Sequence, residues 1–381
     1  MAKRRANREG TVYKRKSDGR WASDFIAPNG KRRTLYAPKS SNTREAAHKR
    51  LMEAQAASID GFSLPPDRIT IAMFAAQWLE TVRPTIRWNT WRGYETLLRV
   101  HAIPAIGNIK LARLNAAKLQ WFYSERLDSG LSPTTVGNVH RVLKKMLNDA
   151  VRWGNLNRNP VTLVSPPPNR NREMAIFSPP QVRSFLEVAR QDDLHAFYVT
   201  AIFTAARLSE LLGLKWQDCD IDGKEPNVHI RHAYRPVEDG YALTPPKSKR
   251  SVRRISLSPV AVSALKAHRS QQAQQALSLG PKWDDAWGLV FASSRGTPLD
   301  GINILKRSFR PLLNKAGLPP LRLHDLRHTG ISLALSEGTP VVDVSRMAGH
   351  AQVSTTLNIY GHVIPGGQQR ATAAIEAAIF G

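Results

Sequence analysis

Two side chains near the carboxyl end of the chain have the types and spacing for a nucleophilic reaction. His350 stands ten residues before Tyr360, in Gly-His-Ala-Gln-Val-Ser-Thr-Thr-Leu-Asn-Ile-Tyr-Gly-His. A phenol is a poor nucleophile at its reference pKa of about 10, so Tyr360 needs help to attack. Guanidinium and imidazole groups on the non-bridging oxygens of a phosphodiester would provide it, because they neutralise the transition state without a metal. Taken singly, the pair indicates only a packed Tyr and His joined by a hydrogen bond.

A second histidine lies one helical turn before an arginine in Leu-His-Asp-Leu-Arg-His-Thr-Gly, residues 323–330. This separation would let His324 and Arg327 point at the same phosphate. His324 and His328 also have the i, i+4 spacing of zinc-binding helices, so a metal site is the alternative. Position 325 is Asp instead of the Glu that such a site uses as its base, and the sequence marks no third ligand. We therefore expect a phosphate-binding pair, with neither a metal nor a cofactor.

Two further cations lie upstream in different surroundings. Arg207 follows Thr-Ala-Ala and precedes Leu-Ser-Glu, so its guanidinium would lie close to a hydrophobic core. By itself such an arginine is more often an ion-pair partner, here of Glu210, than a catalytic group. Lys247 begins the cationic run Lys-Ser-Lys-Arg-Ser-Val-Arg-Arg, which precedes an alternating strand. A turn of this kind can clamp phosphates, although alone it indicates only a basic turn.

The charge balance points to a polyanionic partner. The 381 residues carry 55 Lys and Arg against 30 Asp and Glu, a formal net charge of +25. The lone Cys219 can form neither an internal disulfide nor a thiolate zinc site. No apolar run approaches the roughly 20 residues of a membrane span, and the amino terminus has no apolar signal core. We therefore expect a soluble protein of the cytoplasm with no membrane partner.

The first 60 residues form the most basic block, and their pattern predicts a small sheet. Three short strands are expected at 11–14, 21–26 and 33–36, separated by turns and followed by a helix over 43–57. A small sheet with basic turns can enter a DNA groove. The alternative is a solvated basic tail. Tails rarely carry aromatic residues at strand spacing, as this block does with Trp21, Phe25 and Tyr36, so we favour groove binding.

Helical periodicity follows a linker at 61–67. Amphipathic helices are predicted from Phe74, from Trp91 and over 117–127, the last opened by Asn115 as its cap. A fourth helix begins after Ser132. Its expected buried residues recur at intervals of three and four: Val136, Val139, Val142, Leu143, Met146, Leu147 and Ala150.

A stiff, charged, Pro-rich segment at 165–172 marks a second domain boundary. Beyond it the pattern predicts helices over 179–190 and 196–213, a strand region over 227–258, and further helices to the end. The expected chain is multidomain and mainly α with small β-sheets. Its parts are a three-stranded sheet plus helix at 1–60, a helical bundle at 65–165 and a mixed α+β domain at 175–381.

Taken together, the motifs resemble those of the tyrosine recombinase family, the phage and transposon integrases. They occur in the family's order: Arg207, Lys247, His324-x-x-Arg327, His350 and Tyr360. The resemblance covers nearly the whole chain. It implies an arm-type DNA-binding domain at 1–60, a core-binding helical domain at 65–165, and a catalytic domain of the tyrosine recombinase type at 175–381. One departure is Ala205-Ala206, where such proteins often carry a glycine before the arginine.

The resemblance implies a role for each residue of the site. Tyr360 would be the nucleophile that forms a 3′-phosphotyrosyl bond with DNA. Arg207 and Arg327 would hold the scissile phosphate. His324 and His350 would donate hydrogen bonds to that phosphate, with His324 also a candidate to handle the tyrosine proton.

Two assignments leave alternatives open. Lys247 matches the family's hairpin lysine and would protonate the departing 5′ oxygen, with Lys249 in the same turn as its rival. A carboxylate would orient Arg207, and either Asp218 or Glu210 could supply it.

The resemblance also implies a function and partners. The protein would cleave and rejoin double-stranded DNA at core and arm sites, integrating or excising a phage genome or conjugative element, and would be nucleoid-associated in a bacterial host. Because two duplexes have four strands, a homo-tetramer on DNA is implied, with a host DNA-bending protein or a directionality factor as further partners. The apolar tail from about residue 370 would dock on the next protomer; the alternative is packing on its own domain.

Two other functions compete with recombination. A DNA-binding regulator or architectural protein would have a degenerate catalytic set, and the intact set argues against it. A DNA relaxase of the type IB topoisomerase kind would share the nucleophile but needs neither an arm-binding domain nor a tetramer. The strand block at 1–60 argues against the relaxase.

Overall fold

The structure is a computed structural model that describes residues 10–26, 32–38, 40–59, 68–168, 174–246, 251–363 and 367–380. The chain divides into two compact units, Met1–Asn171 and Arg172–Gly381. Across the ranges given, no helix has the length and apolar character needed to cross a membrane.

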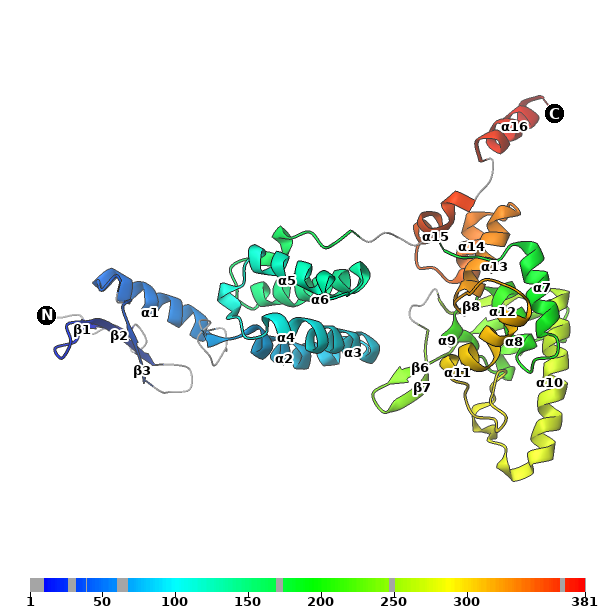
Figure 1. Ribbon diagram of the computed structural model, residues 1–381, viewed down its shortest axis with the longest axis horizontal. Helices are drawn as coiled ribbons and strands as arrows, with labels where there is room; N and C mark the ends of the chain where they lie inside the picture. The colour runs from blue at the N-terminus through cyan, green and yellow to red at the C-terminus, as the bar shows by residue number, and fades with distance from the viewer. Residues whose placement is uncertain are drawn as a thin grey trace. The chain divides into compact units, whose positions relative to one another are not determined.

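The first unit begins with the predicted three-stranded antiparallel sheet. Its strands are β1 (Thr11–Lys14), β2 (Trp21–Ile26) and β3 (Arg32–Tyr36), in the order β1-β2-β3. Helix α1 (Arg44–Ile59) lies against this sheet (Figure 1). Phe25 on the central strand and Leu51 on the helix are buried in the small core between them. The expected sheet plus helix is confirmed.

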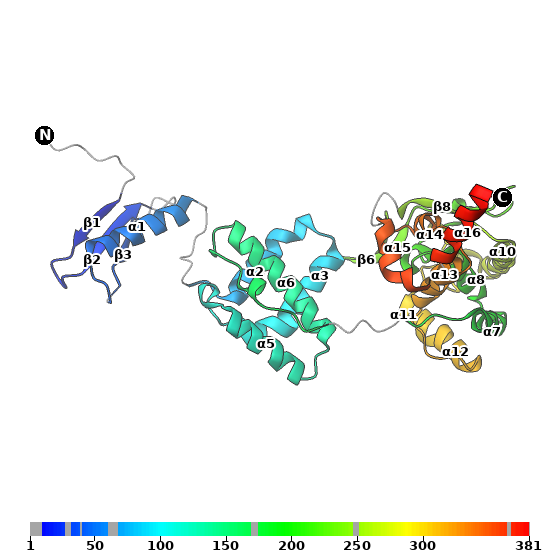
Figure 2. The same cartoon turned by 90° about the horizontal axis from the view of Figure 1, so that it is seen from above.

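A helical bundle makes up the rest of the first unit (Figure 2). Its main helices are α2 (Ile71–Val82), α3 (Trp88–Leu97), α4 (Ile103–Ile106), α5 (Ala116–Asp128) and α6 (Pro133–Arg152). The side chain of Asn115 caps α5, and that of Ser132 caps α6. All seven residues expected to be buried on the fourth helix are buried on α6. Because its opposite face is exposed, α6 packs on the bundle by one side only.

The second unit contains helices around two small sheets. One sheet has the order β4-β5-β8, and β6 and β7 form a separate hairpin. The strands are β4 (Cys219–Asp220), β5 (Asn227–Ile230), β6 (Ala233–Val237), β7 (Gly240–Thr244) and β8 (Arg253–Ser256). The helices are α7 (Pro179–Ala189), α8 (His195–Thr204), α9 (Leu208–Leu211), α10 (Pro259–Leu279), α11 (Gly301–Ile304), α12 (Arg310–Lys315), α13 (Asp325–Ser336), α14 (Val341–Ala348), α15 (Val353–Tyr360) and α16 (Gly367–Phe380).

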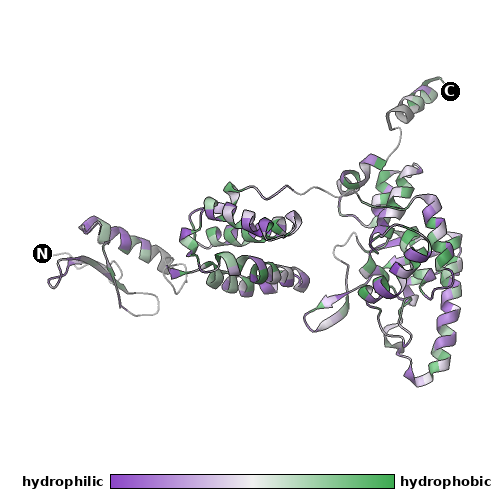
Figure 3. Ribbon diagram, viewed as in Figure 1, coloured by the Kyte–Doolittle hydropathy of each residue, from purple (hydrophilic) through white to green (hydrophobic). Residues whose placement is uncertain are grey.

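Helix α8 forms the centre of this unit. Nearly all of its side chains are buried, and it contacts α7, α10 and α13. Hydrophilic residues occupy much of α10, which covers one side of α8 (Figure 3). Helix α13 comes so close to α8 that a Cβ on Gly330 would lie 2.1 Å from the carbonyl oxygen of Ile202. This contact fixes α13, which carries the His-x-x-Arg motif, against the core.

The helix predicted over 196–213 is wrong in one respect, because it breaks after Thr204. Ala205 has a φ of 49°, in the left-handed region that a glycine adopts more easily. The carbonyl oxygen of Ala205 therefore leaves the helix and accepts a hydrogen bond from Arg327. A new helix, α9, then begins, and Arg207 occupies its N-cap position. The break frees this carbonyl for the contact with Arg327, and it places Arg207 at a helix end instead of on a helix face.

Candidate active site

The site is built around the turn between α14 and α15. Arg207 Nη2 donates to the carbonyl oxygen of Gly349 at 2.9 Å, and Arg327 Nη2 donates to that of Ala348 at 2.7 Å. His350 follows directly in the chain. Gly349 has a φ of 67°, and a Cβ there would lie 2.8 Å from a nitrogen of Arg253. The two arginines predicted to hold one phosphate thus meet at adjacent carbonyls of one turn.

Arg327 is almost fully buried, at 3% exposure, and holds its position by three contacts. It donates to Ala205 O and Ala348 O, and its Nη2 lies 3.0 Å from Nε2 of His350. Wherever the structure describes side chains, no carboxylate forms an ion pair with it. Burial and the charge of Arg207 lower the pKa of Arg327 to about 9. A buried guanidinium without a counter-ion is suited to bind an anion.

Glu210 holds Arg207 by an ion pair, and the side chain of Arg207 remains partly exposed. Its Nη1 donates to Glu210 Oε1 at 2.8 Å, and its side chain is 31% exposed whereas that of Glu210 is fully buried. Asp218, the alternative partner, instead lies near Arg231 and His232, at 3.6 and 3.4 Å. The structure therefore places Glu210 against Arg207.

Glu210 also binds a second arginine that the sequence did not single out. Arg253 Nη2 donates to Glu210 Oε2 at 3.0 Å, and Arg253 Nε donates to Met347 O at 2.6 Å. Burial alone would raise the pKa of Glu210, but Arg253 and Arg207 hold it below its usual range. The carboxylate thus joins α9 to β8, and Arg253 extends the link to the segment that leads to His350.

The two predicted phosphate-binding histidines are neutral. Burial and neighbouring cations lower the pKa of His350 to about 4. His324 is more exposed, and its pKa is lowered by partial desolvation and by His328. His350 Nδ1 lies 2.8 Å from Oγ1 of the buried Thr356. His324 and Arg327 together line a small cavity beside Ala206 and Leu208. Imidazole and guanidinium therefore share one recess, as their spacing suggested.

Tyr360 lies at the end of α15 and is only 1% exposed. Burial raises the pKa of its phenol to about 12. Its oxygen lies 2.5 Å from Nδ1 of His328, a residue that sequence reasoning considered only as a metal ligand. The i, i+4 spacing was the available signal, because it places His328 on the same side of α13 as His324. The ring centroids of His324 and His328 lie 5.1 Å apart.

Lys247 and its rival Lys249 lie outside the described residues, so the structure does not place them. The strand that follows them, β8, carries Arg253 into the site. As for metals, the described segments contain no group of three or more His, Cys, Asp or Glu side chains that could hold an ion.

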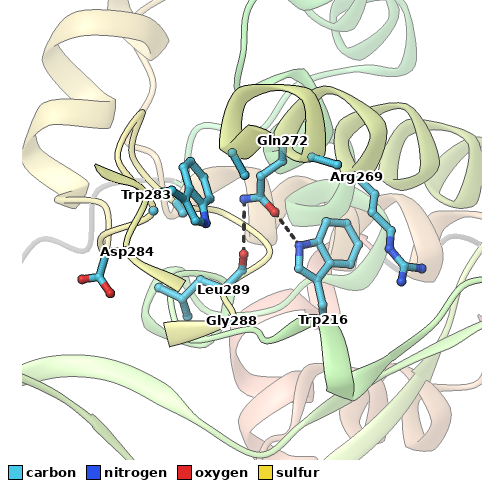
Figure 4. Close-up of a pocket in the computed structure, with 11 residues that line it drawn as sticks. Trp216, Arg269, Gln272, Trp283, Asp284, Gly288 and Leu289 are labelled. Atoms are coloured by element: carbon cyan, nitrogen blue, oxygen red, sulfur yellow. Dashed lines mark hydrogen bonds between the residues drawn. The ribbon is translucent and has the colours of Figure 1, made fainter. Parts of the chain in front are cut away.

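A separate pocket in the second unit contains none of the predicted site residues. Trp216, Arg269, Gln272 and Trp283 are among its lining residues (Figure 4). The Gln272 side chain accepts from Trp216 Nε1 at 2.6 Å and donates to the carbonyl oxygens of Leu289 and Val290. Since its amide is used in these internal bonds, Gln272 joins α10 to the neighbouring loop.

Comparisons with known proteins agree with this arrangement. Residues 177–365 match the phage integrase family, and residues 70–127 match the phage integrase N-terminal SAM-like domain. A tyrosine recombinase XerC-like protein of Caldanaerobacter subterraneus is 30% identical over 339 residues, which cover 83% of this chain and 84% of the relative. An integrase of Streptomyces ambofaciens is 30% identical over 375 residues, 94% of each chain.

Solved structures share the fold. The Tn1549 transposon integrase in complex with a circular intermediate DNA has a TM-score of 0.68 at 21% identity, covering 81% of this chain and 99% of the other. A lambda integrase dimer bound to a COC′ core site has a TM-score of 0.57 at 14% identity, covering 94% of this chain and 96% of the other.

The fold and the relatives define the class of protein. The chain belongs to the phage integrase family of tyrosine recombinases. It is a site-specific DNA recombinase, a DNA strand transferase that acts in the integration of mobile elements. The family, the mainly α fold with small sheets, and the enzyme class expected from the sequence are confirmed.

Proposed function

We propose that Tyr360 attacks a DNA phosphate held by Arg207 and Arg327 and becomes linked to the 3′ end of the cleaved strand. One observation carries this proposal: both guanidinium groups bind the turn that leads into His350, and Tyr360 ends the helix that follows this turn. A phosphate at this turn would find two cations and an imidazole around it. Such donors stabilise the charge that develops in the transition state.

The bond changes of the reaction balance without an external energy source. The Tyr360 oxygen forms a bond to phosphorus, and the bond from phosphorus to the 5′ oxygen breaks. Lys247, or its near neighbour in sequence Lys249, gives a proton to the departing oxygen. Attack by a new 5′-hydroxyl reverses these changes and rejoins the strand. Because one phosphodiester replaces another, neither ATP nor a metal enters the scheme.

We propose double-stranded DNA as the partner, read by two parts of the first unit. The Tn1549 and lambda integrases were solved bound to DNA, and a formal charge of +25 suits a polyanion. Residues 65–165 would bind the core site through the exposed cations of α6, which include Arg141 and Lys144. Residues 1–60 would bind arm sites through the small sheet.

We further propose that four copies assemble on DNA. Lambda integrase was solved as a tetramer on a Holliday junction, and exchange between two duplexes requires cuts in four strands. Helix α16 would join neighbouring protomers, because Ile375, Ile379 and Phe380 are 61%, 65% and 84% exposed. A host DNA-bending protein or a directionality factor would complete the assembly, associated with the nucleoid of a bacterial host.

The direct test of the nucleophile uses a nicked suicide substrate that traps the covalent complex. Tyr360→Phe should bind this DNA as the wild type does but form no adduct, because the ring is kept and the oxygen is lost. Tyr198→Phe is a matched control, since Tyr198 is also buried but bonds Ser308, in the core. An adduct that persists in Tyr360→Phe would refute the proposal.

A further inference from the structure

We infer that His328 is a catalytic residue that takes the phenolic proton of Tyr360 when the tyrosine attacks DNA. This inference rests on the proposed role of Tyr360. It assigns the proton transfer to His328 in place of His324, which leaves His324 to bind the phosphate.

The geometry of the pair carries the inference. Nδ1 of His328 lies 2.5 Å from the phenolic oxygen, and the two ring centroids are 5.7 Å apart. This contact joins α13 to the end of α15, and its two residues are 32 positions apart in sequence. A general base must lie within hydrogen-bond reach of the proton that it removes, and His328 already does.

Tyr360 is held in place by packing against the helix that carries His328. Tyr360 is part of a small core that also contains Ile331 and Leu335 of α13, one turn or more beyond His328, and Val344 of α14. The same α13 positions Arg327 against the turn before His350. Because one helix carries both the phosphate-binding arginine and the proposed base, their geometry relative to Tyr360 is set together.

The electrostatic environment leaves His328 able to accept a proton. Burial is the largest influence and lowers the pKa of His328; Arg327 and Arg322 lower it further, while Asp325 raises it. The imidazole is therefore neutral at neutral pH. Burial raises the pKa of Tyr360 to about 12, so the phenol does not ionise there without a base. The titratable and charged groups facing His328 are Arg322, His324, Asp325 and Arg327 near its own helix, His350 before α15, and Tyr360.

The proton transfer fits the bond changes of cleavage. The phenolic O–H bond breaks as the oxygen bonds phosphorus, and the proton passes to the lone pair of His328 Nδ1. This requires the tautomer of His328 that carries its hydrogen on Nε2. The leaving 5′ oxygen takes a different proton, from Lys247 or Lys249. When the 5′-hydroxyl attacks in the reverse step, His328 returns its proton to the phenolic oxygen.

The test measures the first-order rate of adduct formation by full-length protein on a suicide substrate. His328→Asn places an amide near the position of Nδ1, where it can bond the phenol but cannot remove a proton at neutral pH. We expect a rate about 10²- to 10⁴-fold below wild type, the usual contribution of a general base. His229→Asn is the matched control, because His229 lies on β5, where its Nδ1 accepts from Arg231.

Three further readouts separate proton transfer from a structural role. The defect of His328→Asn should shrink as the pH rises, because hydroxide then ionises the phenol. A trifluorotyrosine at position 360, whose phenol is more acidic, should restore much of the rate. A substrate with sulfur at the bridging 5′ position needs no leaving-group proton, and it should leave the defect in place.

The outcomes divide cleanly. A His328→Asn protein that binds DNA and cleaves at the wild-type rate at every pH would overturn the inference, as would rescue by the bridging sulfur. Should this variant fail to fold, trifluorotyrosine at position 360 of the otherwise wild-type protein provides the test. The cleavage rate should then fall less steeply at low pH than in the wild type. An unchanged fall of the rate at low pH would refute the inference. Tyr360→Phe separates the two proposals. An adduct in that variant would show that Tyr360 is not the nucleophile, and the proposed function itself would then fail.

Discussion

Nη2 of Arg327 lies 3.0 Å from Nε2 of His350. A guanidinium can only donate hydrogen bonds, so Nε2 of His350 must accept this one. The proton of the neutral imidazole is therefore on Nδ1, which donates to Oγ1 of Thr356 at 2.8 Å. A phosphate oxygen that replaced Nε2 as the partner of Arg327 would meet a histidine without a proton to offer on that side. His350 must gain a proton before it can donate to the phosphate.

DNA binding should therefore be coupled to proton uptake. The pKa of His350 is about 4 because of burial and of Arg327, Arg207 and Arg253, and an arriving phosphate anion raises it. At a pH between the pKa of His350 in the free protein and its higher pKa in the complex, DNA binding takes up protons. Calorimetry at about pH 6 in buffers of different ionisation enthalpy measures this uptake. His350→Gln should reduce it and His229→Gln should not; equal uptake in wild type and His350→Gln would contradict the assignment.

Arg327→Lys should slow cleavage strongly. A lysine keeps the charge but cannot contact Ala205 O, Ala348 O and the phosphate with one planar group. We expect a loss of about 10²- to 10³-fold in the first-order cleavage rate, comparable with the removal of one donor from an oxyanion site. Arg190→Lys, at an exposed ion pair with Glu187, is the control. A cleavage rate near that of the control would count against phosphate binding by Arg327.

Glu210→Gln should destabilise the second unit. The change removes the charge that compensates Arg253, whose side chain is only 7% exposed, and we expect a loss of about 3 kcal/mol in the free energy of unfolding. Glu187→Gln, at an exposed pair, should change it by less than about 0.5 kcal/mol. Urea unfolding followed by tryptophan fluorescence provides the comparison, and equal losses in both variants would refute the role of the buried carboxylate.

The same variant should alter the dependence of stability on pH. Because the pKa of Glu210 is lowered by folding, its contribution is fully present above the unfolded pKa and is lost as the pH falls through the folded value. The difference in the free energy of unfolding between wild type and Glu210→Gln should therefore become smaller as the pH falls. A difference in the free energy of unfolding that stays constant down to acid pH would show that the ion pairs of Glu210 do not cause it.

Lys144→Ala should weaken DNA binding in a manner that depends on salt. Lys144 lies on the exposed face of α6, and one lost phosphate contact reduces the slope of log affinity against log salt by about one. Lys266→Ala is the control, since Lys266 pairs with Asp222 at 2.8 Å in the other unit. An unchanged slope for Lys144→Ala would remove this face of α6 from the proposed core-site footprint.

Local sequence patterns predicted much of the fold. The apolar repeat of α6, the Asn115 and Ser132 caps, and the three strands of the first sheet follow from periodicity and turn chemistry, which act over a few residues. The break at Ala205 could not be predicted in this way. The carbonyl that the break releases binds Arg327, 122 residues away, and local patterns do not reveal a contact at that distance along the chain.

Long-range geometry decides the parts of the site that local sequence patterns do not. The residue types and their order were enough to select the arginines, histidines and tyrosine that the structure brings together. The choice between Asp218 and Glu210 required the fold, because either could face Arg207 until α9 was placed. The contact between His328 and Tyr360 likewise depends on how α15 packs against α13.

The most direct measurement is the site of covalent attachment. After reaction with a suicide DNA substrate, proteolysis and mass spectrometry should locate the nucleotide on the peptide that contains Tyr360, joined through a 3′-phosphate. Attachment to any other residue, or linkage through a 5′-phosphate, would contradict the account.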